Sequence, residues 1–238
     1  VSQPRVSRLL KQAGELGTVR GAALLDDSTL LIAGSRGVHA VRMNKAPLQP
    51  QKLLDGEVVG LEIYGGLVYV VRPDRLEVAM PKHLLQHITA RRIALEPGFR
   101  ADRVRREGSS LFIFGREAVT EMSLAEPAKP ELLSTVAHGD FGSIKDMVAN
   151  RHHRYILGER GLQVTEPTQK EPSDYIQVAA DDGLTLKGRF AILVGQNTVE
   201  VLDLAPYSRD GVDTIQSPEA LPAKLSFDDG SSAAPSAR

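Results

Sequence analysis

A short polar corner between two apolar runs of β type recurs five times along the chain. In the first copy, the run at residues 30–33 leads into the corner 34–37 and then into the run 38–41. The residues that directly follow the five corners are Val38, Leu76, Val119, Leu162 and Val199, which are 38, 43, 43 and 37 residues apart. This period is typical of one four-stranded propeller blade. The pattern therefore predicts an all-β fold, a β-propeller with five blades of four antiparallel strands.

A second alternating run precedes each central strand, and a tight polar turn separates the two. We predict these second strands over residues 19–25, 58–63, 101–104, 144–149 and 183–186. The turns that follow them contain Gly, Asp and Asn, which supply the positive φ angles and local hydrogen bonds of short hairpins. Connections this short predict an antiparallel meander within each blade.

Proline-punctuated stretches follow three of the outer strands, at residues 44–54, 124–133 and 165–176. Because proline cannot donate to a β-ladder, we interpret these stretches as crossings from one blade to the inner strand of the next. Residues 6–10 would then form the inner strand of the first blade. Residues 220–227 could pair near the seam of the ring or dock on a rim, and both possibilities stay open.

The third repeat carries a recognisable order of strand and turn classes. It reads Leu-Phe-Ile-Phe at residues 111–114, a turn, Val-Thr-Glu-Met at 119–122 and Glu-Pro-Ala-Lys-Pro at 126–130. This order resembles the LVIVD-type repeat of bacterial β-propellers, and the resemblance covers residues 15–204. It departs in the second repeat, where residues 82–85 follow Pro81 without paired prolines. The resemblance implies a propeller scaffold, a bacterial origin and an envelope or extracellular location, and it implies little chemistry.

The ends of the chain differ in composition from the repeats. Residues 228–238 are small, polar and turn-forming, as in a linker or tail. We therefore expect a single β-propeller domain over residues 1–210 and a C-terminal extension, partly disordered, over 211–238. The start at Val1 without an initiator Met and the linker-like end suggest a module of a larger protein. No stretch approaches the roughly 20 apolar residues that span a bilayer, so we expect no membrane insertion.

Composition narrows the partners and the chemistry. Lys and Arg total 29 and Asp and Glu total 30, so the net charge of −1 gives no long-range attraction to nucleic acid. Aromatic content of 5% without Trp also leaves few stacking platforms for bases, and we expect no nucleic-acid partner. The absence of Cys excludes disulfides, thiolate nucleophiles and Cys-ligated metals. Composition leaves the oligomeric state open.

Two segments are candidates for binding a protein partner. The first concentrates guanidinium groups, which suit carboxylate recognition, within sixteen residues that contain Arg91, Arg92, Arg100, Arg103, Arg105 and Arg106. The second is the polar turn at residues 150–154, which we expect on the functional face of the propeller. The predicted contact residues are Arg103, Arg105, Arg106, Arg151, His152, His153 and Arg154. The alternative interpretation is a solvated, charged rim.

Residues that could support catalysis or metal binding are sparse. His152 and His153 are adjacent, and on an extended strand they would point to opposite faces and could not share an ion. Asp26 with Asp27, and residues 181–183, lack the spacing of a calcium loop and read as turns. No phosphate-binding loop, nucleophile elbow or His-Glu-x-x-His motif occurs. We therefore expect no metal and no cofactor.

These observations favour a non-catalytic propeller that serves as a protein–protein interaction or scaffold module, part of a larger bacterial protein or assembly. The alternative is a propeller enzyme, a hydrolase or lyase. Its site would form if His138, Asp140, His152 and His153 converge on the mouth of the channel, because propeller sites can assemble from separated segments. A third possibility is a structural role in which the module packs against its parent protein.

Overall fold

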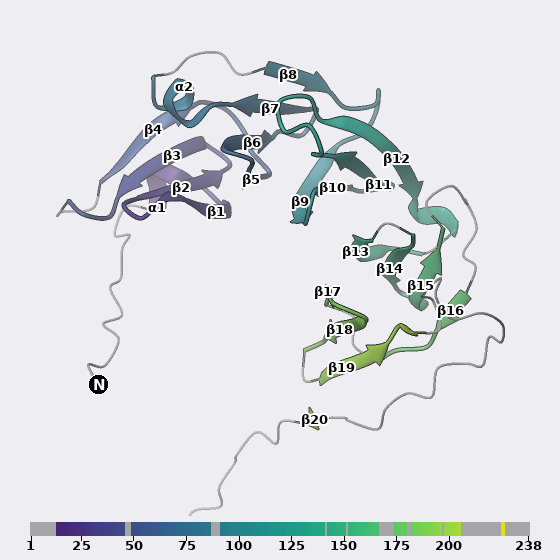
Figure 1. Ribbon diagram of the computed structural model, residues 1–238. Helices are drawn as coiled ribbons and strands as arrows, with labels where there is room; N and C mark the ends of the chain where they lie inside the picture. Colours follow the sequence, from purple (N-terminus) through teal and green to yellow (C-terminus); the bar gives the residue numbers. More distant parts are fainter. Residues whose placement is uncertain are drawn as a thin grey trace, which may run out of the picture. The chain divides into compact units, whose positions relative to one another are not determined.

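The computed structural model describes residues 13–45, 49–86, 91–140, 142–150, 152–166, 174–179, 182–196, 198–205 and 225–226. Its contacts divide the chain into two compact units, Val1–Ala137 and His138–Arg238. Within the described residues the strands form five four-stranded antiparallel sheets, three in the first unit and two in the second (Figure 1). The predicted all-β class with five blades of four strands is confirmed.

The first unit contains three sheets and two short helices. The helices are α1 (Ala13–Leu16) and α2 (Pro81–Leu85). The first sheet comprises β1 (Val19–Asp26), β2 (Thr29–Gly34), β3 (Gly37–Arg42) and β4 (Pro50–Leu54). The second comprises β5 (Gly60–Tyr64), β6 (Leu67–Val71), β7 (Arg75–Ala79) and β8 (Arg91–Ala94). The third comprises β9 (Ala101–Glu107), β10 (Ser110–Gly115), β11 (Ala118–Ser123) and β12 (Glu131–Ala137).

The second unit begins with a 3-10 helix, η1 (His138–Asp140). The fourth sheet comprises β13 (Ile144–Ala149), β14 (Arg154–Gly158), β15 (Gly161–Thr165) and β16 (Asp174–Ile176). The fifth comprises β17 (Gly183–Lys187), β18 (Phe190–Val194), β19 (Thr198–Asp203) and β20 (Leu225–Ser226). Residues 225–226 therefore pair with β19, where Val199 faces Leu225.

The proline-punctuated stretches are not crossings, and that prediction was wrong. Each leads into the fourth strand of its own sheet, as the pairs His39 with Lys52 in β3–β4 and Val164 with Asp174 in β15–β16 show. Pro50 begins an edge strand, where a missing N–H costs no ladder hydrogen bond. The strands predicted as second in each blade are consequently the first. Residues 6–10, predicted as an inner strand, lie outside the described residues, and the first sheet has four strands without them.

The two ends of each sheet carry different connections, because the strands alternate in direction. One end, here the hairpin end, holds the turns between first and second strands and the connections between third and fourth strands. The other, the crossing end, holds the turns between second and third strands and the connections to the next sheet in the same unit. The predicted turn at residues 150–154 thus lies at the hairpin end, and the repeated corners lie at the crossing end.

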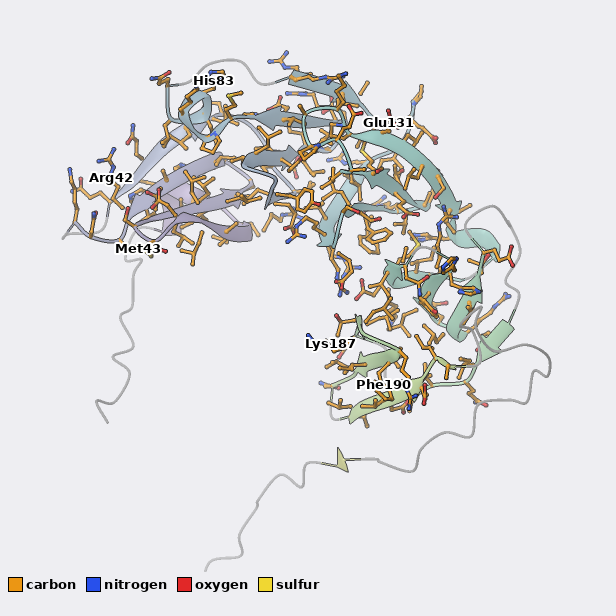
Figure 2. The ribbon with its side chains drawn as sticks, viewed as in Figure 1. Arg42, Met43, His83, Glu131, Lys187 and Phe190 are labelled. Atoms are coloured by element: carbon orange, nitrogen blue, oxygen red, sulfur yellow. The ribbon has the colours of Figure 1, made fainter. Side chains whose placement is uncertain are left out.

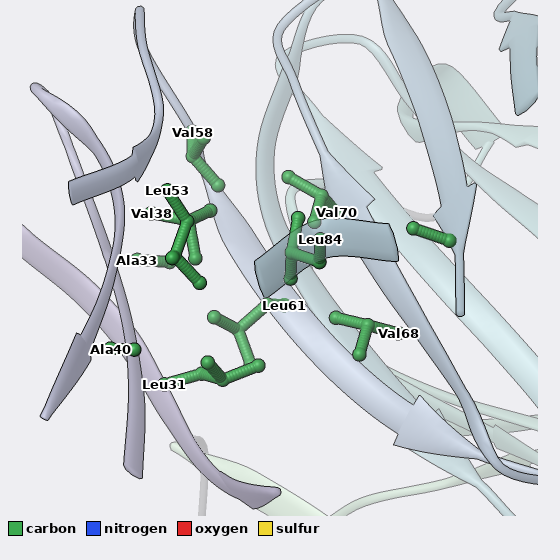
Figure 3. Packing of buried hydrophobic residues seen from close by; sticks show 11 residues of the cluster. Leu31, Ala33, Val38, Ala40, Leu53, Val58, Leu61, Val68, Val70 and Leu84 are labelled. Atoms are coloured by element: carbon green, nitrogen blue, oxygen red, sulfur yellow. The ribbon is translucent and has the colours of Figure 1, made fainter. Parts of the chain in front are cut away.

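The core lies between neighbouring sheets. Leu31 and Val38 of the first sheet pack against Leu61 and Val70 of the second, and Leu84 of α2 joins this cluster (Figure 3). A similar cluster lies between the second and third sheets, and another between the fourth and fifth. β-Branched and leucine side chains on alternate positions of each strand fill these layers, as expected for sheets that are buried on their faces.

The third residue of each third strand is polar, which interrupts these apolar layers. These residues are His39, Glu77, Thr120, Gln163 and Glu200. Glu77 is 3% exposed, and its carboxylate forms ion pairs with Arg72 (Nε–Oε2, 3.0 Å) and Arg75 (Nε–Oε1, 2.8 Å). Nη1 of Arg72 also donates to the backbone carbonyl of Asp55 at 2.8 Å. Through Arg72, Glu77 is thereby linked to the segment that enters the second sheet from the first.

Asp146 has a comparable role in the second unit. It lies on β13, is 2% exposed, and accepts hydrogen bonds from the backbone N–H of Met147 at 3.0 Å and of Leu184 at 2.8 Å. Leu184 belongs to β17, the first strand of the fifth sheet. One buried carboxylate therefore links the first strands of the two sheets of this unit.

Replacing Gly37 with alanine is expected to lower the free energy of unfolding by about 2 kcal/mol. Gly37 has a φ of 122°, and a Cβ there would collide with the carbonyl oxygen of Leu54 in β4. Gly108 is the matched control, because its φ is 56° and nothing lies within 4 Å of the place that a Cβ would occupy. Gly108→Ala should lower the free energy of unfolding only by the cost of a left-handed backbone at a residue with a Cβ, about 1 kcal/mol. Urea unfolding of both variants measures the difference, and equal losses would contradict the clash.

Candidate functional site

The three predicted arginines of β9 do not form one cluster. Alternation along the strand puts Arg103 and Arg105 on one face of the third sheet and Arg106 on the other. The Arg103 guanidinium lies 4.0 Å from the ring centre of Phe114. Arg105 pairs with Glu107 at 3.5 Å, and Nη1 of Arg106 donates to the carbonyl of Gly108 at 2.7 Å. Each guanidinium thus has a contact within its own unit, and Arg103 is the most exposed of the three.

The second predicted segment is a turn organised by Asn150. Its Oδ1 accepts hydrogen bonds from the backbone N–H of His152 at 2.9 Å and of His153 at 2.8 Å. His152 is exposed, and the ring of His153 lies 6.2 Å from that of Tyr155. Arg154 is 5% exposed and lies within β14. Arg151, which was also predicted here, lies outside the described residues.

The histidines of the enzyme alternative do not converge. His138 lies in η1, just before β13, whereas His152 and His153 follow β13 at its other end. A six-residue strand spans about 17 Å, so the two groups lie at opposite ends of the fourth sheet. Burial lowers the pKa of His138. This arrangement offers no shared proton-transfer site, and the convergence expected under that alternative was wrong.

The acidic turns have local structural partners. Oδ1 of Asp26 accepts hydrogen bonds from the N–H of Ser28 at 2.8 Å and from its hydroxyl at 2.9 Å, and these bonds hold the pKa of Asp26 below its ordinary value. Asp182 is exposed, and Asp181 lies outside the described residues. Among the described residues, no group of three His, Asp or Glu side chains is placed to hold a metal ion.

A cavity of about 430 Å³ lies at the crossing end of the third sheet. Three segments line it: the connection before β9, the corner between β10 and β11, and β12. The lining residues are Glu96, Pro97, Gly98, Phe99, Arg100, Arg116, Glu117, Ala118 and Thr135. We call this the third-sheet pocket. Its location at a sheet end, where rigid strands hold several loops together, is where binding sites of such folds gather.

The backbone around the third-sheet pocket is held by hydrogen bonds to the second sheet. The N–H groups of Leu95 and Ala101 donate to the carbonyls of Asp74 and Pro73, at 3.2 Å and 2.8 Å. Gly115 allows the segment to approach closely, because a Cβ there would lie 2.8 Å from the carbonyl oxygen of Arg100. These contacts position the pocket-lining loop before any ligand binds.

The charges of the third-sheet pocket are of both signs and only weakly paired. Arg100 lies 3.8 Å from Glu57, with its side chain largely exposed. Within the part of the chain that the structure describes, the side chains of Arg116 and Glu117 have no hydrogen-bond or ion-pair partner. Oε1 of Glu96 accepts a hydrogen bond from the hydroxyl of Thr135 at 3.0 Å. The pocket therefore presents two cations and two anions to whatever enters it.

Arg100 was named from the sequence, but the rest of this pocket was missed. The corner that contains Arg116 and Glu117 was identified only as a repeat marker. A usable signal was present, since two opposite charges occupy a two-residue turn at the end where the sheet connections also gather.

No helix within the described residues has the length and apolar character needed to cross a bilayer.

The comparisons with known proteins identify the fold. No protein-family model and no curated protein matches the sequence. Among solved structures, the WD40 β-propeller domain of Doa1 superposes with a TM-score of 0.59 at 10% identity, over 86% of this chain and 70% of that one. Hsv2 of Kluyveromyces lactis gives a TM-score of 0.48 at 10% identity, over 79% of this chain and 61% of that one. The likeness to the Doa1 domain, together with the five sheets, shows that this chain has a β-propeller fold.

Proposed function

We propose that this chain is a non-catalytic β-propeller module that binds a protein partner through the crossing end of its third sheet. The observation that carries the proposal is the third-sheet pocket, with its preformed backbone and its weakly paired charges of both signs. Such a site is complementary to a peptide segment that carries both an acidic and a basic side chain. A ligand whose charges all have one sign would meet two pocket side chains of the same sign, and their repulsion would oppose binding.

The remaining predicted features form part of the same proposal. The module belongs to a larger bacterial protein or assembly of the LVIVD-repeat type, in the cell envelope or outside the cell, and requires no cofactor. In this proposal residues 1–210 form the body of one propeller domain, and the C-terminal extension 211–238 completes its fifth sheet with β20. The exposed side chains of Arg103 and His152 make secondary contacts with the partner. The other predicted contact residues support these contacts: Arg105, Arg106, Arg151, His153 and Arg154.

Selection of peptides tests this function. A displayed library of random heptapeptides is panned against the immobilised full chain, and the most enriched sequence is synthesised with a fluorescent label. Its affinity, measured by fluorescence anisotropy, is expected to fall about tenfold in Arg116→Ala and in Glu117→Ala, since a close charge pair across an interface contributes about 1.4 kcal/mol or more. Arg36→Ala is the matched control, because Arg36 occupies the same kind of corner in the first sheet.

The selected sequences provide a second readout. Enriched heptapeptides are expected to carry at least one acidic and one basic residue. The proposal would be overturned if panning enriched no sequence over an unrelated protein, or if the enriched peptides bound equally well to Arg116→Ala, Glu117→Ala and Arg36→Ala.

A further inference from the structure

The outer edge of the third sheet lies beside the third-sheet pocket. β12 has seven residues, more than the fourth strand of any other described sheet. It begins at Glu131 (Figure 2), and β11 is its one strand neighbour in the described structure. An edge strand presents a row of unpaired backbone N–H and C=O groups, which another extended chain can pair with. Thr135 belongs both to this strand and to the pocket lining.

Two adjacent leucines of β12 are exposed to solvent. Leu132 is 51% exposed and Leu133 is 53% exposed. The register shifts between Glu121 and Met122, so Leu133 forms a bulge. Met122 pairs with Leu132 and Thr120 pairs with Thr135. Because residues two apart on β11 share a face, the bulge puts Leu132 and Thr135 on the same face of the sheet.

We propose that an extended peptide segment of the partner adds to the third sheet as a fifth strand along β12. This inference rests on the proposed function and deepens it. The backbone of the segment pairs with the regular part of the edge, residues 134–137. An apolar side chain of the segment covers Leu132 and Leu133, and its charged residues enter the third-sheet pocket. Strand addition of this kind takes its affinity from main-chain hydrogen bonds and its specificity from the side-chain sites beside them.

The charges favour a partner peptide over a second copy of this chain. Antiparallel pairing of two β12 strands about Ser134 would bring Glu131 of one copy beside Ala137 of the other, at the pocket end. The second copy would then offer the pocket a carboxylate and no cation, although the pocket presents both signs. The bulge at Leu133 would also occur twice in such a pair, and bulges disfavour edge-to-edge pairing of sheets.

The experiment uses the labelled heptapeptide from the selection and two N-methylated forms of it. Methylation of alternate residues removes the N–H groups on one side of an extended peptide and leaves those on the other side. One alternate set is expected to weaken binding more than about thirtyfold, and the other to stay within about threefold. Hydrogen exchange should show added protection of residues 131–137 when the unmodified peptide is bound.

Variants of the full chain complete the test. The double variant Leu132→Lys with Leu133→Lys should weaken binding of the peptide about tenfold. Leu24→Lys, at a leucine of β1 that is 61% exposed, should leave the affinity unchanged. Equal binding by both methylated forms, or unaltered exchange at 131–137, would overturn strand addition while leaving pocket binding intact. Sedimentation that shows a dimer abolished by the leucine variant would assign the edge to a second copy and also overturn the inference.

Discussion

Glu77→Gln is expected to lower the free energy of unfolding of the first unit by about 3 kcal/mol. The carboxylate is buried and pairs with Arg72 and Arg75, and Nε of Arg92 approaches it at 3.6 Å. Glutamine keeps the size of the side chain and removes its charge. Arg72 is then left as an uncompensated buried cation, which is far more costly than losing both partners of the pair. Urea unfolding followed by circular dichroism measures the loss.

The pH dependence of this effect has a defined sign. Burial by itself would raise the pKa of Glu77, but the hydrogen bonds and charges of Arg75 and Arg72 outweigh it, and the pKa lies below the ordinary value of 4.5. A lowered folded-state pKa contributes stability above the unfolded pKa, and this stability is lost as the pH falls through the folded value. The difference between wild type and Glu77→Gln should therefore be full at pH 7 and shrink below pH 4.5.

Asp74→Asn is the matched control for Glu77→Gln. Asp74 also pairs with Arg75, at 3.0 Å, but its side chain is largely exposed. Exposed ion pairs contribute about 0–1 kcal/mol, so this variant should change stability by no more than that. Similar losses in the two variants would show that burial of the Glu77 network is not what stabilises the second sheet.

Asp146→Ala is expected to destabilise the second unit by about 3 kcal/mol, because it leaves the buried N–H groups of Met147 and Leu184 without an acceptor. Each such group costs about 1–3 kcal/mol. The damage should be local to the contact between β13 and β17. Hydrogen exchange is therefore expected to accelerate at residues 183–187 and much less at residues 154–165.

Asp182→Ala serves as the control for Asp146→Ala. Asp182 is an exposed aspartate directly before β17, so its loss should leave both the urea midpoint and the exchange pattern near wild type. Uniform acceleration over the whole unit in Asp146→Ala, with no preference for β17, would argue against a specific link between the two first strands.

Much of the strand pattern could be predicted because it is local. Residues that alternate with period two around a corner form a hairpin wherever they lie in the fold, so β2 with β3 and β10 with β11 were recognised directly. The fourth strands were not, because Leu53 and Leu54 would pair acceptably with either of two neighbours. Which neighbour they choose is a matter of long-range register, and the ladder between His39 and Lys52 decided it.

The candidate site shows the same division. The arginines of β9 were prominent in the sequence because they are close together in it, but alternation sends their side chains to opposite faces. The third-sheet pocket joins Glu96, Arg116 and Thr135, which are about 20 residues apart from one to the next and share no motif. The charged corner that contains Arg116 is visible in the sequence, but no linear pattern joins it to Glu96 and Thr135.

By itself, the sequence determined the all-β class, the repeat length, the corners, and the lack of cysteine and strong net charge. These follow from composition and from the spacing of neighbouring residues. Only the tertiary structure decided which strands share a sheet, which end of the third sheet carries the pocket, and that Glu77 and Asp146 are buried links. Those properties depend on contacts between distant segments, where the free energy of pairing and burial selects one arrangement among several that the local pattern allows.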